Sequence, residues 1–274
     1  MKDLVLSGEK SDLQISGSWD NREKISCFMN LNNLDLSRWI KNQKPTQLSG
    51  LFIMDANLTK QMALDQIDMT IEMAEEKLLD QGEISIHGLL SYQDSVLKTI
   101  DPVMLLIEDS YLTIDGEGDF SSNKIELLID MEKADIELVN NFLPGNFLSG
   151  KATGKLKVSG NTNNPSAIAK LSCDDVKISD FQLKSIELNS KITVIDSIPQ
   201  GFIDIKTGEG TWRNRSFESG TVSAILDDKS FVIENCHFKS KNDFLQASGS
   251  FDGTDKYKIN RMQLAYKNNY LVNT

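Results

Sequence analysis

The sequence contains few of the residues on which hydrolytic and metal-dependent enzymes rely. It has two histidines, His87 and His237, and neither lies in a nucleophile or metal-ligand motif. Its three cysteines, Cys27, Cys173 and Cys236, are far apart and form no Cys-x-x-Cys pair, which argues against a disulfide scaffold and a zinc site. We expect the cysteines to be small apolar side chains in a core. The sequence thus predicts no enzyme, no cofactor and no metal, and leaves open whether any cysteines pair.

Two patterns match ligand-binding motifs only in part. Asp115, Glu117 and Asp119 have carboxylates at alternate positions, but the bidentate glutamate of a calcium loop is absent. On a strand these side chains would simply face outward. The glycines of 116–118 and 208–210 lack the third glycine and the following helix of a dinucleotide site. We interpret them as turn or strand glycines.

The chain also lacks a long apolar run and an excess of positive charge. No run approaches the ~18 residues of a membrane span, and the first residues, MKDLVLSGEK, lack a targeting pattern. With 29 basic and 40 acidic residues the net charge is −11, which repels nucleic acid and disfavours docking on anionic lipid. Because a strand is expected almost at once and the chain stops without a clear cap, we predict a fragment of a longer protein.

What the sequence does contain is alternation of apolar and polar residues. Within 151–160, Ala152, Gly154, Leu156 and Val158 alternate with lysines and hydroxylic residues, as in a half-buried strand. Residues 67–73 alternate similarly, although nearby glutamates also permit a helix. Short helices are expected only at 34–41 and 135–143. Strands are expected at 12–31 as a hairpin, and at 48–59, 67–73, 82–92, 96–100, 102–107, 111–120, 123–133, 151–160, 167–173, 183–195, 201–207, 216–226, 230–240, 244–251 and 257–266.

Similar segments recur along the chain. DLQISGSWDN at 12–21 matches YLTIDGEGDF at 111–120 and DFLQASGSFDG at 243–253, and the tripeptide Leu-Ser-Gly occurs at 48–50 and 148–150. We predict one continuous β-repeat array over 1–274, with copies at about 12–110, about 111–242 and a truncated 243–274. A sandwich, a closed barrel, a β-solenoid or a curled open sheet would each cover the apolar face. Glycines at matching points of the repeat favour the curled sheet.

These repeats resemble a known family. The segment ISGSWDN at 15–21 followed by NLDLSRWI at 33–40, and above all FLPGNFLSGKATGKLKVSGNTNNP at 142–165, are similar to repeats of the TamB-like proteins. TamB is a translocation and assembly module subunit of the AsmA-like superfamily. The resemblance covers Ile136–Pro144, Leu148–Pro165 and Leu171–Leu188 most closely, and it points to an internal β-repeat segment.

The resemblance implies a fold, a place and a function. The fold would be all-β, an elongated, curled antiparallel meander forming a U-shaped apolar groove (a β-taco), with one or two very short helices. The segment would lie in the periplasm, within a protein anchored to the inner membrane of a Gram-negative cell. It would shield phospholipid acyl chains between the two membranes, and support outer-membrane protein assembly and secretion with a TamA-like barrel partner. Membrane contact would come from parts outside this segment.

The apolar positions of the expected strands form the predicted groove lining. Each of them could instead be an ordinary core position that touches no lipid. They are Ile25, Met29, Ile67, Met69, Ile71, Ile84, Ile86, Leu112, Ile114, Ile125, Leu127, Ile129, Leu156, Val158, Ile186, Leu188, Ile192, Val194, Val222, Leu226, Phe231 and Ile233.

Two other functions fit an all-β repeat. A scaffold or chaperone without lipid transport would offer strand edges to nascent barrel proteins or autotransporters. A secreted β-solenoid would have a closed core, although its repeat of ~20–30 residues is much shorter than the repeat found here. The sequence leaves open the lipid species, the direction and energy source of transport, the flanking regions, and whether the apolar face is an open groove or a dry core.

Overall fold

The computed structural model describes residues 2–7, 12–20, 23–34, 48–59, 64–77, 83–137, 148–212, 215–227, 230–241, 243–251, 257–266 and 269–273. The chain divides into two compact units, Met1–Ile129 and Asp130–Thr274. Strand β9 (Lys124–Asp135) passes from the first unit into the second. The boundary therefore falls inside the second predicted repeat copy, and the repeat boundaries themselves stay a prediction.

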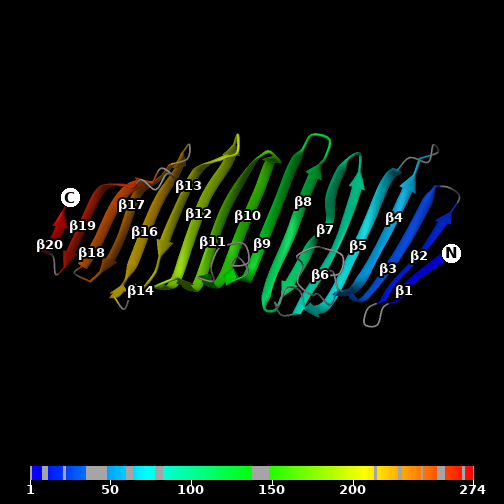
Figure 1. Cartoon of the computed structure of the whole chain (residues 1–274), viewed down its shortest axis with the longest axis horizontal. Helices are drawn as coiled ribbons and strands as arrows, with labels where there is room; N and C mark the ends of the chain where they lie inside the picture. Colours follow the sequence, from blue (N-terminus) through cyan, green and yellow to red (C-terminus); the bar gives the residue numbers. More distant parts are fainter. Residues whose placement is uncertain are drawn as a thin grey trace. The chain divides into compact units, whose positions relative to one another are not determined.

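Unit 1 is an antiparallel meander in which each strand pairs with the next along the chain, as Figure 1 shows from dark blue to green. Its strands before β9 are β1 (Lys2–Ser7), β2 (Asp12–Asp20), β3 (Lys24–Leu34), β4 (Leu48–Leu58), β5 (Leu64–Lys77), β6 (Glu83–Gln93), β7 (Val96–Ile107) and β8 (Ser110–Asp119).

Unit 2 continues the same arrangement from green to red in Figure 1. After β9 its strands are β10 (Leu148–Asn161), β11 (Asn164–Ile178), β12 (Phe181–Ile195), β13 (Ile198–Thr207), β14 (Gly210–Trp212), β15 (Arg215–Phe217), β16 (Ser219–Asp227), β17 (Ser230–Ser240), β18 (Asp243–Phe251), β19 (Tyr257–Tyr266) and β20 (Asn269–Asn273).

The predicted all-β class and antiparallel meander are confirmed. The helix alternative for 67–73 is wrong, because these residues lie within β5. The helix predicted at 34–41 lies outside the described residues after Leu34. Of the helix predicted at 135–143, residues 136–137 form a 3₁₀ turn, and 138–143 lie outside the described residues. The U-shaped cross-section of a groove stays a prediction.

A predicted break between two strands at 101 is also wrong, because β7 runs on through Pro102. The paired register with β8 is interrupted between Lys98 and Val103. Proline has no backbone N–H to donate to a neighbouring strand, so a strand that contains it is irregular at that point. The break predicted at 101 thus corresponds to a local irregularity beside Pro102 and not to the end of the strand.

Two hairpins turn through residues whose backbone is left-handed. Asp94 and Ser95 have φ values of 50° and 68°, and Asp196 and Ser197 have values of 49° and 66°. Positive φ at both central residues is the mark of a type I′ turn, whose twist matches that of the flanking strands. These turns fix the register of β6 with β7 and of β12 with β13, and so determine which side chains share a face.

Strands β13 and β14 are two parts of one interrupted strand, and β15 and β16 are two parts of the next. Strand β12 pairs with β13 along Ile186–Ile195 and with β14 along Phe181–Leu183. On the other side β14 pairs with β15, and β13 pairs with β16. The interruptions lie at 208–209 and at 218. These interruptions let the sheet bend at this end while the order of the strands is kept.

Candidate functional site: an apolar face on each unit

The register of unit 1 collects apolar side chains on one face, which we call the apolar face of unit 1. Side chains of an antiparallel pair that lie directly opposite each other point to the same face of the sheet. Leu13 and Leu31, 9% and 7% exposed, form its most buried cluster. The rows of paired residues that cross β3, β4, β5 and β6 are Leu31, Gly50, Met73 and Ile86; Met29, Phe52, Ile71 and Gly88; Cys27, Met54, Met69 and Leu90; and Ile25, Ala56, Ile67 and Tyr92.

Unit 2 has a corresponding apolar face over β10, β11, β12, β13, β16 and β17. Its most buried cluster contains Val176, Leu183 and Phe217. The rows of paired residues that cross it are Ala152, Cys173, Ile186, Thr207, Gly220 and Phe238; Gly154, Leu171, Leu188, Ile205, Val222 and Cys236; Leu156, Ala169, Ser190, Ile203, Ala224 and Ile233; and Val158, Ala167, Ile192, Gly201, Leu226 and Phe231.

The residues predicted to line a groove lie on these two faces. Ile84 and Ile186 are buried, and the other predicted lining residues are half-buried. In unit 1, Leu112 lies opposite Leu105, Ile114 lies opposite Val103, and Ile125, Leu127 and Ile129 are the half-buried positions that alternate with exposed ones along β9. In unit 2, Val194 lies opposite Pro199. That lipid touches them stays a prediction.

The sequence prediction missed several members of the two faces. Phe52 lies between Met29 and Ile71, and Ile205 lies between Leu188 and Val222. Phe52 belongs to a segment, 50–56, in which every second residue is small or apolar, so the signal was available. Phe238 could not be assigned in this way. An irregularity near residue 234 shifts the register of β17, so the alternation of faces before it does not continue to Phe238.

An aromatic cluster covers one end of the apolar face of unit 2. The Phe181 ring stacks on Trp212 at a centroid distance of 5.6 Å, and the Phe238 ring meets Phe217 edge-on at 5.0 Å. Phe181 and Phe238 also contact each other at 6.1 Å. Offset and edge-on pairs of this kind add attraction beyond the burial of apolar area. The cluster thus fixes the position of several large rings where the sheet is interrupted.

The rings of this cluster lie over glycines. A Cβ atom added at Gly210 would lie 2.7 Å from the Phe217 ring, and one added at Gly220 would lie 2.5 Å from the Phe238 ring. The Gly220 position also approaches the Thr207 hydroxyl, at 2.7 Å. Because these two glycines have no side chain, the aromatic rings can pack directly against the backbone.

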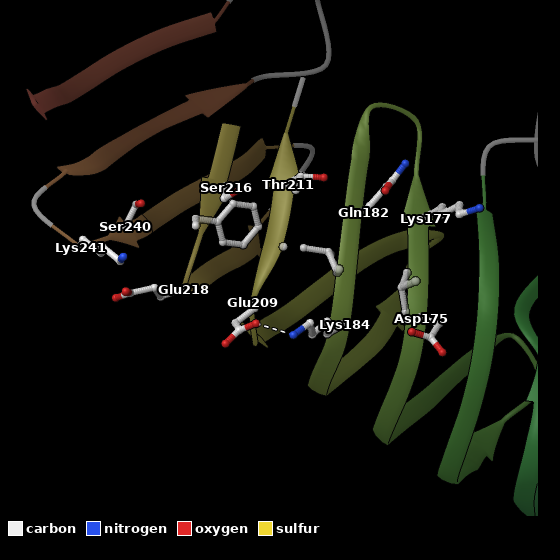
Figure 2. A pocket seen from close by; sticks show the side chains of 14 residues that line it. Asp175, Lys177, Gln182, Lys184, Glu209, Thr211, Ser216, Glu218, Ser240 and Lys241 are labelled. Carbon is white, nitrogen blue, oxygen red and sulfur yellow. Dashed lines mark hydrogen bonds and ion pairs between the residues drawn. The ribbon is translucent and has the colours of Figure 1, made fainter. Parts of the chain in front are cut away.

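A pocket of about 620 Å³ lies at the interrupted part of unit 2, and its lining includes Val176, Leu183 and Phe217 of the buried cluster as well as polar residues. The cross-strand row Lys177, Gln182, Thr211 and Ser216 forms one border of it, and a second row that includes Asp175, Lys184, Glu209 and Glu218 forms the other (Figure 2). Hydrogen bonding between Lys184 and Glu209 raises the pKa of the lysine and lowers the pKa of the glutamate. Both side chains are open to solvent, so water screens the pair.

Two of the three carboxylates that partly match a calcium loop, Asp115 and Asp119, have protein partners. The Thr99 hydroxyl donates a hydrogen bond to Asp115 at 2.5 Å. The hydroxyls of Ser121 and Ser122 donate to Asp119 at 2.7 and 2.6 Å and lower the pKa of its carboxyl. Among the described residues no group of three or more His, Cys, Asp or Glu side chains is placed to hold a metal ion. The described part of the chain also has no helix that could cross a membrane.

Two cysteines on the apolar face of unit 2 are expected to react slowly. Burial, together with the nearby Asp174 charge, raises the pKa of Cys173, and burial raises the pKa of Cys236. Because the thiolate is the reactive form, we expect iodoacetamide at pH 8 to modify both at least about tenfold more slowly in the folded chain than in urea. Mass spectrometry of peptides after timed quenching measures the rates. Equal rates in the folded and unfolded chain would contradict this assignment.

Comparison with known proteins now adds to this geometry. The family model described as TamB, N-terminal domain, matches residues 1–229. This chain belongs to the TamB family. The match covers both apolar faces as far as β16, and it confirms the family predicted from the repeats. Searches of curated proteins and of solved structures found no match.

TamB proteins belong to the cell envelope and are associated in general with an outer-membrane partner of the TamA type. Family membership thus places both apolar faces in a protein of the cell envelope.

Proposed function

We propose that this TamB segment shields phospholipid acyl chains as they pass between the inner and outer membranes of a Gram-negative envelope. The observation that carries the proposal is the half-buried apolar face on each unit, combined with membership of an envelope family. A face that is half-buried in the chain alone retains apolar area that another apolar molecule can cover. Acyl chains are the apolar molecules that an envelope protein meets.

The energy of moving lipid explains why such a face is useful. An acyl chain of about 16 carbons loses on the order of 12 kcal/mol when it is drawn into water, at ~0.8 kcal/mol for each methylene group. A strip of Ile, Leu, Val, Met and Phe side chains offsets most of that cost and needs no tight binding at any one position. The head group would remain in water. No catalytic group is required, and we propose that the segment is not an enzyme and uses no cofactor.

The dimensions of the face suit this role. In unit 2 the apolar positions of β10 run from Ala152 to Val158. At roughly 3.3 Å per residue this gives a strip about 20 Å wide along the strand direction. An extended acyl chain lying across the strands would contact one residue from each strand, spaced about 4.8 Å apart. Several rows of such contacts are therefore available side by side.

The remaining parts of the proposal concern place and partners. We infer a periplasmic location within a protein anchored to the inner membrane, with membrane contact made by parts outside this segment. Cooperation with a TamA-like barrel would link lipid supply to the assembly and secretion of outer-membrane proteins. The net charge of −11 disfavours nucleic acid as a partner.

Native mass spectrometry of the purified chain tests the proposal directly. The chain is prepared from bacterial cells in detergent, exchanged into a volatile buffer, and examined for bound mass. We expect adducts whose masses match diacyl phospholipids and which disappear when the chain is unfolded in acid. A soluble protein of similar size and charge, purified in parallel, controls for carry-over of lipid.

Absence of lipid adducts from the folded chain would overturn the proposal. It would favour the alternative in which TamB is a scaffold that pairs strand edges with nascent barrel proteins, without transporting lipid. That alternative predicts crosslinks from edge strands to unfolded barrel clients.

A further inference from the structure

One polar atom on the apolar face of unit 2 lacks a partner. Thr207 ends β13 and is 9% exposed. Its Oγ1 atom is buried and has no hydrogen-bond partner among the residues that the structure describes. Directly opposite it on the two neighbouring strands lie Ile186 and Gly220. The hydroxyl is thus a lone donor within apolar surroundings.

An aromatic ring lies close to this hydroxyl, on the glycine that is paired with Thr207. Gly220 lies opposite both Thr207 and Phe238, and a Cβ atom added there would lie 2.7 Å from Thr207 Oγ1 and 2.5 Å from Phe238 Cδ1. The ring therefore lies over the glycine and beside the threonine. Phe238 itself is half-buried and belongs to the edge of the aromatic cluster. Rotation of the ring off Gly220 would open space beside the hydroxyl.

The residue type at position 207 is not the one that packing favours. Valine has nearly the same shape as threonine and carries no hydroxyl to leave unpaired. A buried donor without an acceptor destabilises the folded chain relative to an apolar group of the same shape. The other polar residue on this part of the face, Ser190, is also buried, but its hydroxyl is not among the unpaired buried atoms.

We propose that Thr207 Oγ1 is a ligand contact, which donates a hydrogen bond to the ester carbonyl of a phospholipid after the Phe238 ring turns off Gly220. This inference rests on the proposed lipid function and names one contact of it. An ester carbonyl is a neutral acceptor attached directly to an acyl chain, so it reaches the hydroxyl while the chain covers Ile186 and Ile205. A free fatty-acid carboxylate fits less well, because burying a charge in apolar surroundings without a cation is costly.

The test compares two lipids that differ only in the acceptor. Phosphatidylcholine with brominated chains is offered in the diacyl ester form and in the diether form, which lacks the carbonyl oxygens. Bromine quenches tryptophan fluorescence, and Trp212 stacks on Phe181 within the aromatic cluster. Trp19 and Trp39 are first replaced with phenylalanine, which leaves Trp212 as the only fluorescent reporter of the three tryptophans.

We expect the chain with Thr207 to bind the ester lipid about fivefold more tightly than the diether, as one net hydrogen bond would give. Thr207→Val should abolish this preference and raise the urea midpoint of the lipid-free chain. Thr207→Ser should keep the preference. Phe238→Leu should increase the association rate for both lipids, because leucine is smaller than phenylalanine and obstructs less of the space beside the hydroxyl.

Thr221→Val is the matched control on the next strand. The Thr221 hydroxyl accepts a hydrogen bond from Asn235 at 3.3 Å, on the opposite face of β16. We expect this variant to lower the urea midpoint slightly and to retain the ester preference.

Three results would overturn the inference. Equal binding of ester and diether lipid by the parent chain would show that Thr207 makes no such bond, while the lipid function itself would stand. A preference that persists in Thr207→Val would place the contact elsewhere. Binding of neither lipid would overturn both the inference and the proposed function.

Discussion

Replacement of Leu127 with arginine is expected to reduce lipid transfer by about tenfold or more while the chain still folds. Leu127 is half-buried on the apolar face of unit 1, beside Gly116. A guanidinium at this point would place an unpaired charge in the path of the acyl chains, and a single interruption is enough to obstruct a continuous apolar path. Leu156→Arg is expected to act in the same way on unit 2. Transfer of a fluorescent phospholipid from donor to acceptor vesicles by the purified chain measures the effect.

The residue next to Leu127 provides a matched control. Leu128 is 38% exposed and lies on the opposite face of the same strand. Leu128→Arg introduces the same charge at the same level of the sheet, but into water, so lipid transfer should be unchanged. Circular dichroism and urea unfolding establish that both variants fold. Normal transfer by a folded Leu127→Arg chain would argue against transport along this face.

A large effect on stability is expected from Gly116→Ala. The backbone of Gly116 has a φ of 150°, and a Cβ atom there would lie 2.1 Å from the carbonyl oxygen of Glu126 and 2.9 Å from Leu127 Cα. Both contacts are with the backbone of the paired strand, which cannot move aside without breaking its own hydrogen bonds. We expect a loss of about 3 kcal/mol in the free energy of unfolding, measured by urea titration.

Gly118 lies two residues further along the same strand and provides the control. It faces the same way as Gly116, but a Cβ atom there would meet only the Lys124 carbonyl oxygen, at 4.0 Å. Gly118→Ala is therefore expected to leave stability unchanged or to raise it by about 0.5 kcal/mol, because alanine restricts the unfolded chain. If the two variants were equally stable, the close approach of β8 to β9 at Gly116 would not exist in solution.

The lining residues could be assigned from the sequence because successive side chains of a strand point to opposite faces, whatever the strand pairs with. Ile67, Met69 and Ile71 alternate with polar residues, and the parity of each position determines its face wherever no bulge intervenes. The same reasoning placed Leu156 and Val158 together. The polar turns between strands limit the length of each segment, so the antiparallel meander also followed from local pattern.

Features that depend on register between strands could not be predicted. The overlap of Phe238 with Gly220 and Thr207 requires the pairing of three strands and the irregularities within β17. The unpaired hydroxyl of Thr207 is likewise invisible in the sequence, where a threonine in a strand is an ordinary residue. The break predicted at 101 corresponds to an irregularity beside Pro102, but the sequence did not reveal that the pairing resumes beyond it.

Most of the strands in both units pair with the strand next to them along the chain, and this has a consequence for how the protein forms. A hairpin with a short turn, such as β6 with β7 or β12 with β13, can close with little loss of entropy before its contacts are made. A chain that emerges gradually from a translocation pore could then add one hairpin after another to the sheet already formed. The same arrangement would let a gene gain or lose whole hairpins, which changes the number of strands and so the extent of apolar surface.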